Sequence, residues 1–590
     1  MISMAPKDKP ASSYPGIWKY PTNRDVPFRM AEDWLAAKRK DDDIEKLWRV
    51  YDKLYNFEPF IPNHPGGADW LIMTRGTDIT EAFESSHTVN VEQVEMMLTK
   101  FYVKDASHPR ISPYTFKSDG FYKTLKRRIQ PILKKVGTGP TKTVLLMQDS
   151  LVVTFLVLSV IGALYNSTVS SVLAGIVLGL CTIAAHNFFH LRENWRKYIF
   201  DLSFLSSYEW RITHFFSHHL YTNTLMDIEL TLFPTYQFLP NRPKSWFQRY
   251  FSIVYSHVIY AVGFWVDIIK RVIHIATGQK SLRPENLIVL IELAVFLCIS
   301  DTLQNGLKTW ALIHTVSSYT LLTIGATASH HHPEVFHDGD EPLADPDFGI
   351  GQLDATRDRA ENFFNNLFVT LVTFGHHPLH HLFPTICHSK LHYLTPVFQQ
   401  TVREFKLDYP GIPQVELYFA LHKQLARTEI LKPVIILSVD NVRSFSVSVP
   451  PVKSVCKSMH PGHDKYKPQT IDSPFSVSTD ISEVAGGSVV EVLLQGSGNK
   501  TFKGYYLQAR DSNDAPIGMF NSNTLAKVHS CGGIRANAAH HANSEEKNRI
   551  TVSWMAPKRY SGDITFTATF VENYVQFWTH VKAPTVKVNS

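Results

Sequence analysis

The sequence predicts a multidomain protein: an α-helical membrane domain with four spans and one interfacial helix, followed by an all-β sandwich. Five apolar stretches lie between residues 144 and 328, and segments of alternating polarity fill the last third of the chain. The length supports several units, since 590 residues exceed one ordinary core and about 100 to 200 residues per domain is usual.

Bulk composition excludes several classes of protein. The formal net charge of +6 is modest for this length and no long basic tail occurs, so we expect no nucleic-acid partner. The cysteines form no CxxC or CxxCH motif, which excludes thiolate zinc modules and c-type haem. Cys181, Cys298 and Cys387 are interpreted as buried thiols. The N-terminus lacks a secretory apolar core, so we expect the first domain in the cytosol.

Four of the apolar stretches are interpreted as spans across a lipid bilayer. Tyr250 to Ile269 is the exception, because His257, Asp267 and flanking basic residues suit a helix at the headgroup level. Basic residues before the first span favour the cytosolic side for that end of the domain. The four expected spans are Val144 to Tyr165, Val169 to Ala185, Leu287 to Ile299 and Trp310 to Ala328.

A His-Pro-Gly-Gly turn containing His64 is followed twenty-three residues later by His87. Together with the segment from Leu47 to Tyr102, this resembles cytochrome b5 over residues 31 to 103. The resemblance implies a small α+β domain that binds haem b between His64 and His87 and passes single electrons. It also implies an NADH-dependent cytochrome b5 reductase as electron donor. Ala68 replaces the acidic residue usual after this turn, so we expect altered docking of that reductase.

Eight histidines occur in three clusters at the membrane-proximal ends of apolar stretches. Spacings of three and four residues place imidazoles on one face of a helix, and converging faces can enclose two metal ions. Nitrogen ligands alone leave iron, zinc, copper and nickel open, whereas a membrane setting beside a haem donor favours iron. The eight are His186 and His190, then His214, His218 and His219, then His377, His380 and His381.

The segments HNFFH, THFFSHHLYTN and GHHPLHHLFP resemble the three histidine boxes of membrane fatty acyl desaturases and hydroxylases. The resemblance implies that the eight histidines bind two non-haem iron ions and that His376 is a bystander. His330, in an Ala-Ser-His segment, is a ninth candidate ligand. Two features depart from fused members of the family, which often have glutamine at the position of His377 and HxxHH in the second box.

This family resemblance implies a function in lipid oxidation. Electrons from the haem domain and O2 as co-substrate would oxidise a fatty acyl chain of a lipid or acyl-CoA, in the endoplasmic reticulum membrane with the histidines facing the cytosol. The sequence leaves desaturation and hydroxylation open, as well as a haem electron-transfer protein without desaturase activity. Residues 1 to about 428 resemble the cytochrome b5-related proteins of insects.

The last third resembles a reeler domain, found in extracellular and insect defence proteins, through segments such as FKGYYLQAR and HSCGG. The resemblance implies a disulfide between Cys456 and Cys531. Four spans, however, return this domain to the cytosol, where disulfides rarely persist. Either the domain functions reduced or the chain joins two genes, and an adhesion or defence role dominated by this domain is a further alternative.

We therefore expect six segments along the chain. They are a flexible N-terminus (1–30), the haem domain (31–103), a basic linker (104–143), the desaturase-like membrane domain (144–428), a second linker (429–452) and the reeler-like β-sandwich (453–590).

Overall fold

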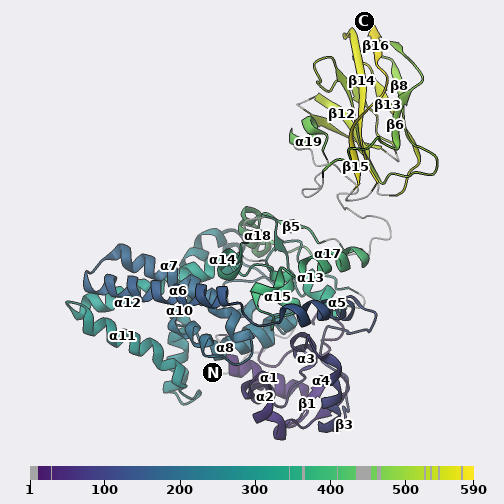
Figure 1. Ribbon diagram of the computed structural model, residues 1–590. Coiled ribbons are helices and arrows are strands. Elements are labelled where there is room, and N and C mark those ends of the chain that lie inside the picture. Colours follow the sequence, from purple (N-terminus) through teal and green to yellow (C-terminus); the bar gives the residue numbers. More distant parts are fainter. Residues whose placement is uncertain are drawn as a thin grey trace. The chain divides into compact units, whose positions relative to one another are not determined.

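The computed structural model divides into two compact units, Met1–Leu437 and Ser438–Ser590, each with its own core (Figure 1). The expected flexible N-terminus, residues 1–30, falls partly outside the described residues, and the expected linker 429–452 falls mostly outside them. The structure describes residues 11–27, 29–327, 329–343, 346–361, 366–407, 409–432, 453–460, 467–523, 526–531, 534–542, 545–572 and 576–589.

The N-terminal part of the first unit is a small α+β arrangement. Three short strands form an antiparallel sheet in the order β1-β2-β3, and the fully buried Trp48 of β1 packs against Phe57. Short helices surround this sheet and hold the two haem-ligand candidates at their ends. The elements are α1 (Ala31–Asp42), β1 (Trp48–Val50), β2 (Lys53–Tyr55), α2 (Ala68–Thr74), α3 (Thr80–Ser86), α4 (Val91–Leu98) and β3 (Tyr102–Asp105).

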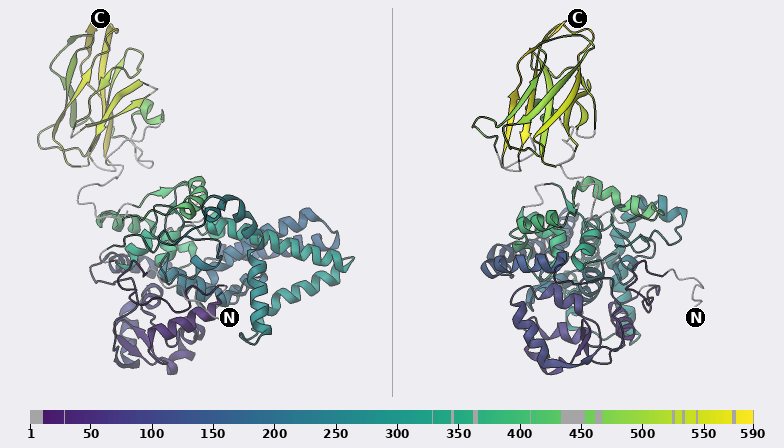
Figure 2. Two further views of the ribbon diagram at one scale, coloured as in Figure 1. Left: turned by 180° about the vertical axis from the view of Figure 1, so that it is seen from behind. Right: turned by 90° about the vertical axis from the view of Figure 1, so that its right-hand side faces the viewer.

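Long apolar helices project from one side of the first unit, where α6, α7, α10 and α12 lie together (Figure 1 and Figure 2). Glycines permit the close approach of α7 and α12, since a Cβ at Gly175 or Gly179 would collide with α12. These helices, with the connector before them, are α5 (Phe121–Val136), α6 (Lys142–Leu164), α7 (Thr168–His190), α10 (Ser252–Ala276), α11 (Ile288–Ile299) and α12 (Leu303–Ala326).

Three of the described helices, α6, α7 and α10, are long and apolar enough to cross a membrane. This differs from the four expected spans. Helix α11 has only 12 residues, and α12 has 24 but carries Gln304, Asn305 and Lys308 in its first turns. The prediction that Cys298 is buried is wrong, because this residue lies on the exposed outer side of α11. Cys181 and Cys387 are buried, as expected.

Short helices and turns between and after the long ones form the rest of the first unit and carry most of the candidate metal ligands. They are η3 (Trp195–Leu202), α8 (Ser207–Trp210), the π-helix η4 (Arg211–His219), α9 (Trp246–Tyr250), α13 (Phe348–Asp354), α14 (Leu367–Val372), α15 (His377–Leu382), α16 (His388–Leu391), α17 (Thr395–Glu404) and α18 (Gln414–Ala426), with the two-residue strands β4 (Asp358–Arg359) and β5 (Gly411–Ile412).

The second unit is an all-β sandwich, as the alternating sequence pattern predicts. One sheet has the strand order β10-β13-β8-β6, and the other β11-β12-β9-β14-β16-β7 with β15 paired to β14. The predicted disulfide between Cys456 and Cys531 is confirmed. The strands are β6 (Phe475–Thr479), β7 (Glu483–Ala485), β8 (Val489–Gly496), β9 (Gly504–Asp511), β10 (Met519–Phe520), β11 (Ala526–Cys531), β12 (Ile534–His541), β13 (Arg549–Met555), β14 (Gly562–Val571), β15 (Phe577–Lys582) and β16 (Val586–Asn589), preceded by the short helix α19 (Lys453–Ser458).

Replacement of Trp554 by alanine is expected to destabilise the sandwich by about 3–5 kcal/mol. The indole is fully buried against Phe566, and its Nε1 donates a hydrogen bond to the Ile517 carbonyl, so truncation leaves a cavity and an unpaired acceptor. Urea unfolding followed by tryptophan fluorescence measures the change. The exposed Val489→Ala is the matched control, and an equal loss of stability in both variants would contradict this prediction.

Candidate metal centre

Three separate helices bring the histidine clusters together. Helix α7 ends with His186 and His190, and α15 carries the third cluster. The second cluster lies on the π-helix η4, whose wider turn places residues five apart on one face. His214 and His219 therefore face one another, with 3.1 Å between their Nε2 atoms. All eight predicted histidines and His330 are buried.

The first group of imidazoles converges on His186. Its Nε2 lies 2.9 Å from Nε2 of His190, 3.0 Å from that of His214 and 3.2 Å from that of His380. His219 completes the group through its contact with His214, so five ring nitrogens share one small volume.

The second group contains four imidazoles and includes the ninth candidate, His330. The Nε2 of His330 lies 3.1 Å from Nε2 of His218 and 2.5 Å from that of His377. His381 offers a ring nitrogen to the same volume as His218 and His330. The π-helix thus assigns His218 to the second group although its neighbour His219 belongs to the first.

In five of the rings, a hydrogen bond at Nδ1 shows the protonation state of the Nε2 atom that faces the other histidines. Nδ1 contacts Glu229 in His214 (2.7 Å), Asp227 in His218 (2.9 Å), the Ala355 carbonyl in His330 (3.1 Å), the Phe374 carbonyl in His377 (3.3 Å) and Gln352 in His381 (3.2 Å). An acceptor at Nδ1 fixes the proton there and leaves an unprotonated Nε2.

Several such unprotonated nitrogens facing one another at about 3 Å repel unless a cation lies between them. This set of ring nitrogens therefore fits metal ions, and the nearby carboxylates of Glu229 and Asp227 add negative charge that stabilises a cation. Nδ1 of His218 lies 2.9 Å from Asp227 and 3.6 Å from Glu229, so two carboxylates favour positive charge at this position.

The two haem-ligand candidates are arranged in a similar way. Nδ1 of His64 contacts the Gly67 carbonyl at 2.8 Å, and Nδ1 of His87 contacts the Phe83 carbonyl at 2.9 Å. The ring centroids lie 6.5 Å apart, which leaves room for a metal with nitrogen bonds of about 2 Å on either side. Burial lowers the pKa of His64 and lowers that of His87 to about 4, so both rings stay neutral as ligation requires.

Sequence reasoning missed several residues around these histidines. Asp227 and Glu229 follow the second cluster within ten residues. Two carboxylates so soon after a histidine cluster are the sequence signal that could have identified them as its hydrogen-bond partners. His388 is also buried, with its ring centroid 4.5 Å from that of His380, and Asn187 accepts at its Nδ1. His376, expected to be a bystander, belongs to neither group.

The Asp227→Asn variant is expected to weaken metal binding by about 10- to 100-fold. Its carboxylate accepts from His218 and from the Asn223 and Glu229 amides, so the change disturbs the orientation of His218 and removes a charge. Competition with a chelator measures the affinity. Asp149→Asn, which affects a carboxylate paired with Arg196 elsewhere, is the control, and equal affinities in the two variants would refute this role.

Three family models match the chain, and their order agrees with the fold. The cytochrome b5-like heme/steroid binding domain matches residues 32–107, the fatty acid desaturase family residues 165–412 and the reeler domain residues 454–590. The protein is thus a fatty acid desaturase-like oxidoreductase of membranes, with an attached cytochrome b5-like domain and a reeler domain.

Comparison with individual proteins shows the family to which the chain belongs. A cytochrome b5-related protein of Drosophila melanogaster is 39% identical over 416 residues, which cover 70% of this chain and 95% of the relative. The chain belongs to this family of cytochrome b5-related proteins.

Two further relatives match parts of the chain. The acyl-lipid (8-3)-desaturase B of Dictyostelium discoideum is 26% identical, covering 63% of this chain and 88% of the relative. Putative defense protein 3 of Antheraea mylitta is 34% identical over 139 residues, covering 23% and 83%. The human F-spondin reeler domain aligns at 19% identity and a TM-score of 0.19, covering 21% of this chain and 95% of that one.

Proposed function

We propose that this protein is a membrane-bound di-iron desaturase that uses O2 to oxidise fatty acyl chains of lipids or acyl-CoA, with electrons from its own haem domain. The observation that carries the proposal is the convergence of nine imidazoles in two groups, five of which have an acceptor at Nδ1 that leaves the other ring nitrogen free to bind a metal. The names of the Dictyostelium relatives favour desaturation, and lipid hydroxylation is the alternative.

In this proposal each group of imidazoles binds one iron ion. His186, His190, His214, His219 and His380 form the first site, and His218, His330, His377 and His381 the second. Bound iron would supply the oxidising power for an unactivated C–H bond. The protein's residues hold the ligands in place: Glu229 and Asp227 fix the proton on Nδ1 of His214 and His218, and the buried rings of Phe189 and Phe215 keep water away from His186 and His190.

His64 and His87 would hold haem b. Haem bound by both imidazoles would have no open position for oxygen, so this part of the chain would transfer single electrons and would not oxidise the acyl chain itself. An NADH-dependent cytochrome b5 reductase is the proposed donor. We propose the predicted segment 31–103 as this haem domain and 144–428 as the oxidising domain.

The contacts of α10 support four spans rather than three. Near its start, Ser252 contacts His422 of α18 at 3.0 Å, and near its end Arg271 pairs with Glu209 of α8 at 2.9 Å. Both partners lie in segments connected to histidine clusters without an intervening apolar stretch. We infer that α10 returns to the side it starts from, and that α6, α7, α11 and α12 are the spans. The basic residues before α6 support a cytosolic metal centre in the endoplasmic reticulum membrane.

The reeler domain is the basis of a second candidate function, in adhesion or defence. The Cys456–Cys531 disulfide and the similarity to putative defense proteins favour it. Because four spans place this domain in the cytosol, the two functions demand different compartments. Glycosylation of Asn499 in intact cells would support the lumenal or extracellular alternative, whereas an unmodified Asn499 supports the desaturase topology.

Lipid analysis of cells that express the full chain tests the main proposal. We expect a new unsaturated acyl product with the unaltered chain, and none when His380→Ala and His381→Ala are combined. His376→Asn is the matched control, because His376 belongs to neither group and its φ of 53° is one that asparagine tolerates. Identical lipid profiles in all cells would refute desaturase activity on host lipids.

A further inference from the structure

The backbone next to the haem-ligand candidate His87 is hydrogen-bonded to the segment that directly follows the third histidine cluster. Thr385 Oγ1 donates to the carbonyl of Ser86, the residue before His87, at 3.1 Å. The Tyr122 hydroxyl lies 3.0 Å from the Glu84 carbonyl and 3.3 Å from the carbonyl of Leu382, which directly follows His381. Two side chains thus bridge α3 and the segment of α15.

A buried ion pair holds this bridge in place. The Glu84 carboxylate accepts from Lys126 at 2.8 Å and from Lys123 at 2.5 Å, and Lys126 also donates to the Glu84 carbonyl at 2.7 Å. Although burial acts against it, Lys126 and Lys123 hold the pKa of Glu84 below its ordinary value, so the carboxylate stays charged. Breaking such a buried pair is strongly unfavourable, which makes the contact between the two parts rigid.

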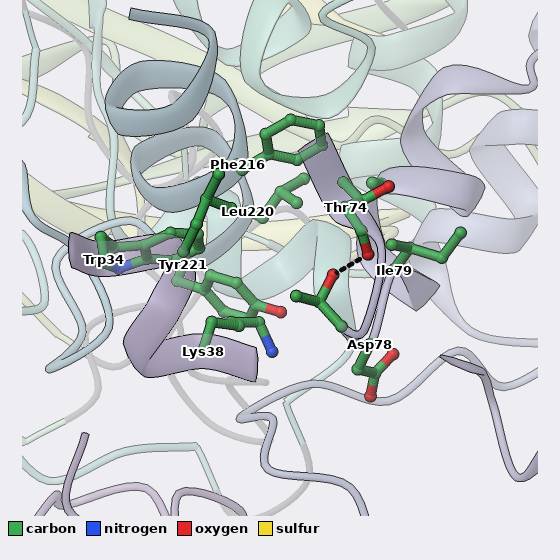
Figure 3. Close-up of a pocket in the computed structure, with 11 residues that line it drawn as sticks. Trp34, Lys38, Thr74, Asp78, Ile79, Phe216, Leu220 and Tyr221 are labelled. Carbon is green, nitrogen blue, oxygen red and sulfur yellow. Dashed lines mark hydrogen bonds between the residues drawn. The ribbon is translucent and has the colours of Figure 1, made fainter. Parts of the chain in front are cut away.

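The turn that carries His64, the other haem-ligand candidate, also contacts the part of the chain that carries the histidine clusters. The Glu193 amide, three residues after His190, donates to the Gly66 carbonyl at 3.0 Å, and Lys197 and Arg211 lie 3.7 Å from Asp69. A nearby contact continues the interface, where Phe216, Leu220 and Tyr221 face Trp34, Thr74 and Ile79 (Figure 3). Acidic residues beside both haem ligands are thus paired within this chain.

From these contacts we propose that Thr385 and Tyr122 are positioning residues for electron transfer: they hold the His87 segment against α15 and provide the bonded route by which electrons reach the metal centre. The proposal rests on the proposed function. Haem held by His64 and His87 would supply single electrons, the metal ions held by the two groups of histidines would accept them, and O2 would be the final electron acceptor. Electronic coupling falls more steeply across gaps than through bonds, so loss of either bridge slows this step.

Stopped-flow absorbance on the full-length, haem- and iron-loaded protein tests the proposal. The haem is reduced without oxygen and then mixed with O2 and a saturated acyl-CoA, and its reoxidation is followed. We expect Thr385→Val and Tyr122→Phe each to slow reoxidation by about 10- to 100-fold. The haem spectrum, haem reduction potential, iron content and oxidation of haem by added ferricyanide should not change.

Matched substitutions elsewhere separate this role from general damage. Tyr236→Phe removes a buried hydroxyl bonded to Ser256, and Thr154→Val a hydroxyl bonded within its own helix, and both should reoxidise at the unaltered rate. Amide hydrogen exchange gives a second readout: Thr385→Val and Tyr122→Phe should raise exchange at residues 84–87 and leave 48–55 unchanged.

The outcomes separate the route from the function. Unaltered reoxidation in the combined Thr385→Val and Tyr122→Phe variant, with the unaltered protein still faster than His186→Ala, would overturn the route and retain the desaturase proposal. Equal rates in the unaltered protein and in His186→Ala would overturn both, because no electrons would then reach the metal centre.

Discussion

The His186→Ala variant is expected to lose non-haem iron and to form acyl product at least about 100-fold more slowly than the unaltered protein. A lost partner of a metal ligand already costs about 10- to 100-fold in metal affinity or activity, and His186 is itself the proposed ligand at the middle of its group. Its Nε2 lies within 3.2 Å of three other ring nitrogens. Metal analysis and product formation by the purified protein measure the two effects.

The haem domain provides an internal reference for this experiment. Because His64 and His87 belong to a separate site, the haem spectrum of His186→Ala should be that of the unaltered protein. His376→Asn should retain both iron and product formation. Full iron occupancy in His186→Ala would show that these imidazoles do not hold the metal.

The His87→Ala variant is expected to lose its haem while retaining non-haem iron. Removal of one axial imidazole opens the bis-histidine site, and product formation driven by NADH and reductase should fall by at least about 100-fold. The Soret absorbance and a pyridine haemochrome assay measure haem content. Electrons supplied by a small chemical reductant should restore part of the activity, because the metal centre is intact.

The half-buried His108 is the matched control for this change, since its ring lies 3.1 Å from the neighbouring Pro109 carbonyl and belongs to neither group of imidazoles. His108→Ala should bind haem and form product normally. If His87→Ala turned over at the unaltered rate with NADH and reductase, electrons would not pass through this haem, and the proposed internal donor would be wrong.

Much of the site was predictable because its chemistry is local in the sequence. The His-Pro-Gly-Gly turn and the three boxes place candidate ligands at fixed spacings, and the structure brings the nine predicted imidazoles into two groups. Their division between the groups was not predictable, because it depends on the π-helix. A regular α-helix would pair His214 with His218, whereas the π-helix turns His219 toward His214.

The interactions around the ligands depend on tertiary contacts that no spacing encodes. Asp227 meets His218 through a turn, Gln352 reaches His381 from α13, and Thr385 meets Ser86 across 299 residues of sequence. The sandwich and its disulfide were predictable from alternation and family resemblance. The exposure of Cys298 was not, because hydropathy alone does not distinguish the outer side of a helix from its packed side.

The most direct test is a single turnover by the purified full-length protein. The protein is reduced through its haem, given an isotope-labelled saturated acyl substrate, and exposed to O2 or kept under nitrogen before mass spectrometry of the acyl chain. If the protein is a desaturase, we expect an acyl product that has lost two hydrogen atoms and that forms only with O2 and only when His186 is present. Oxidation of the haem by O2 with an unchanged acyl chain would contradict it.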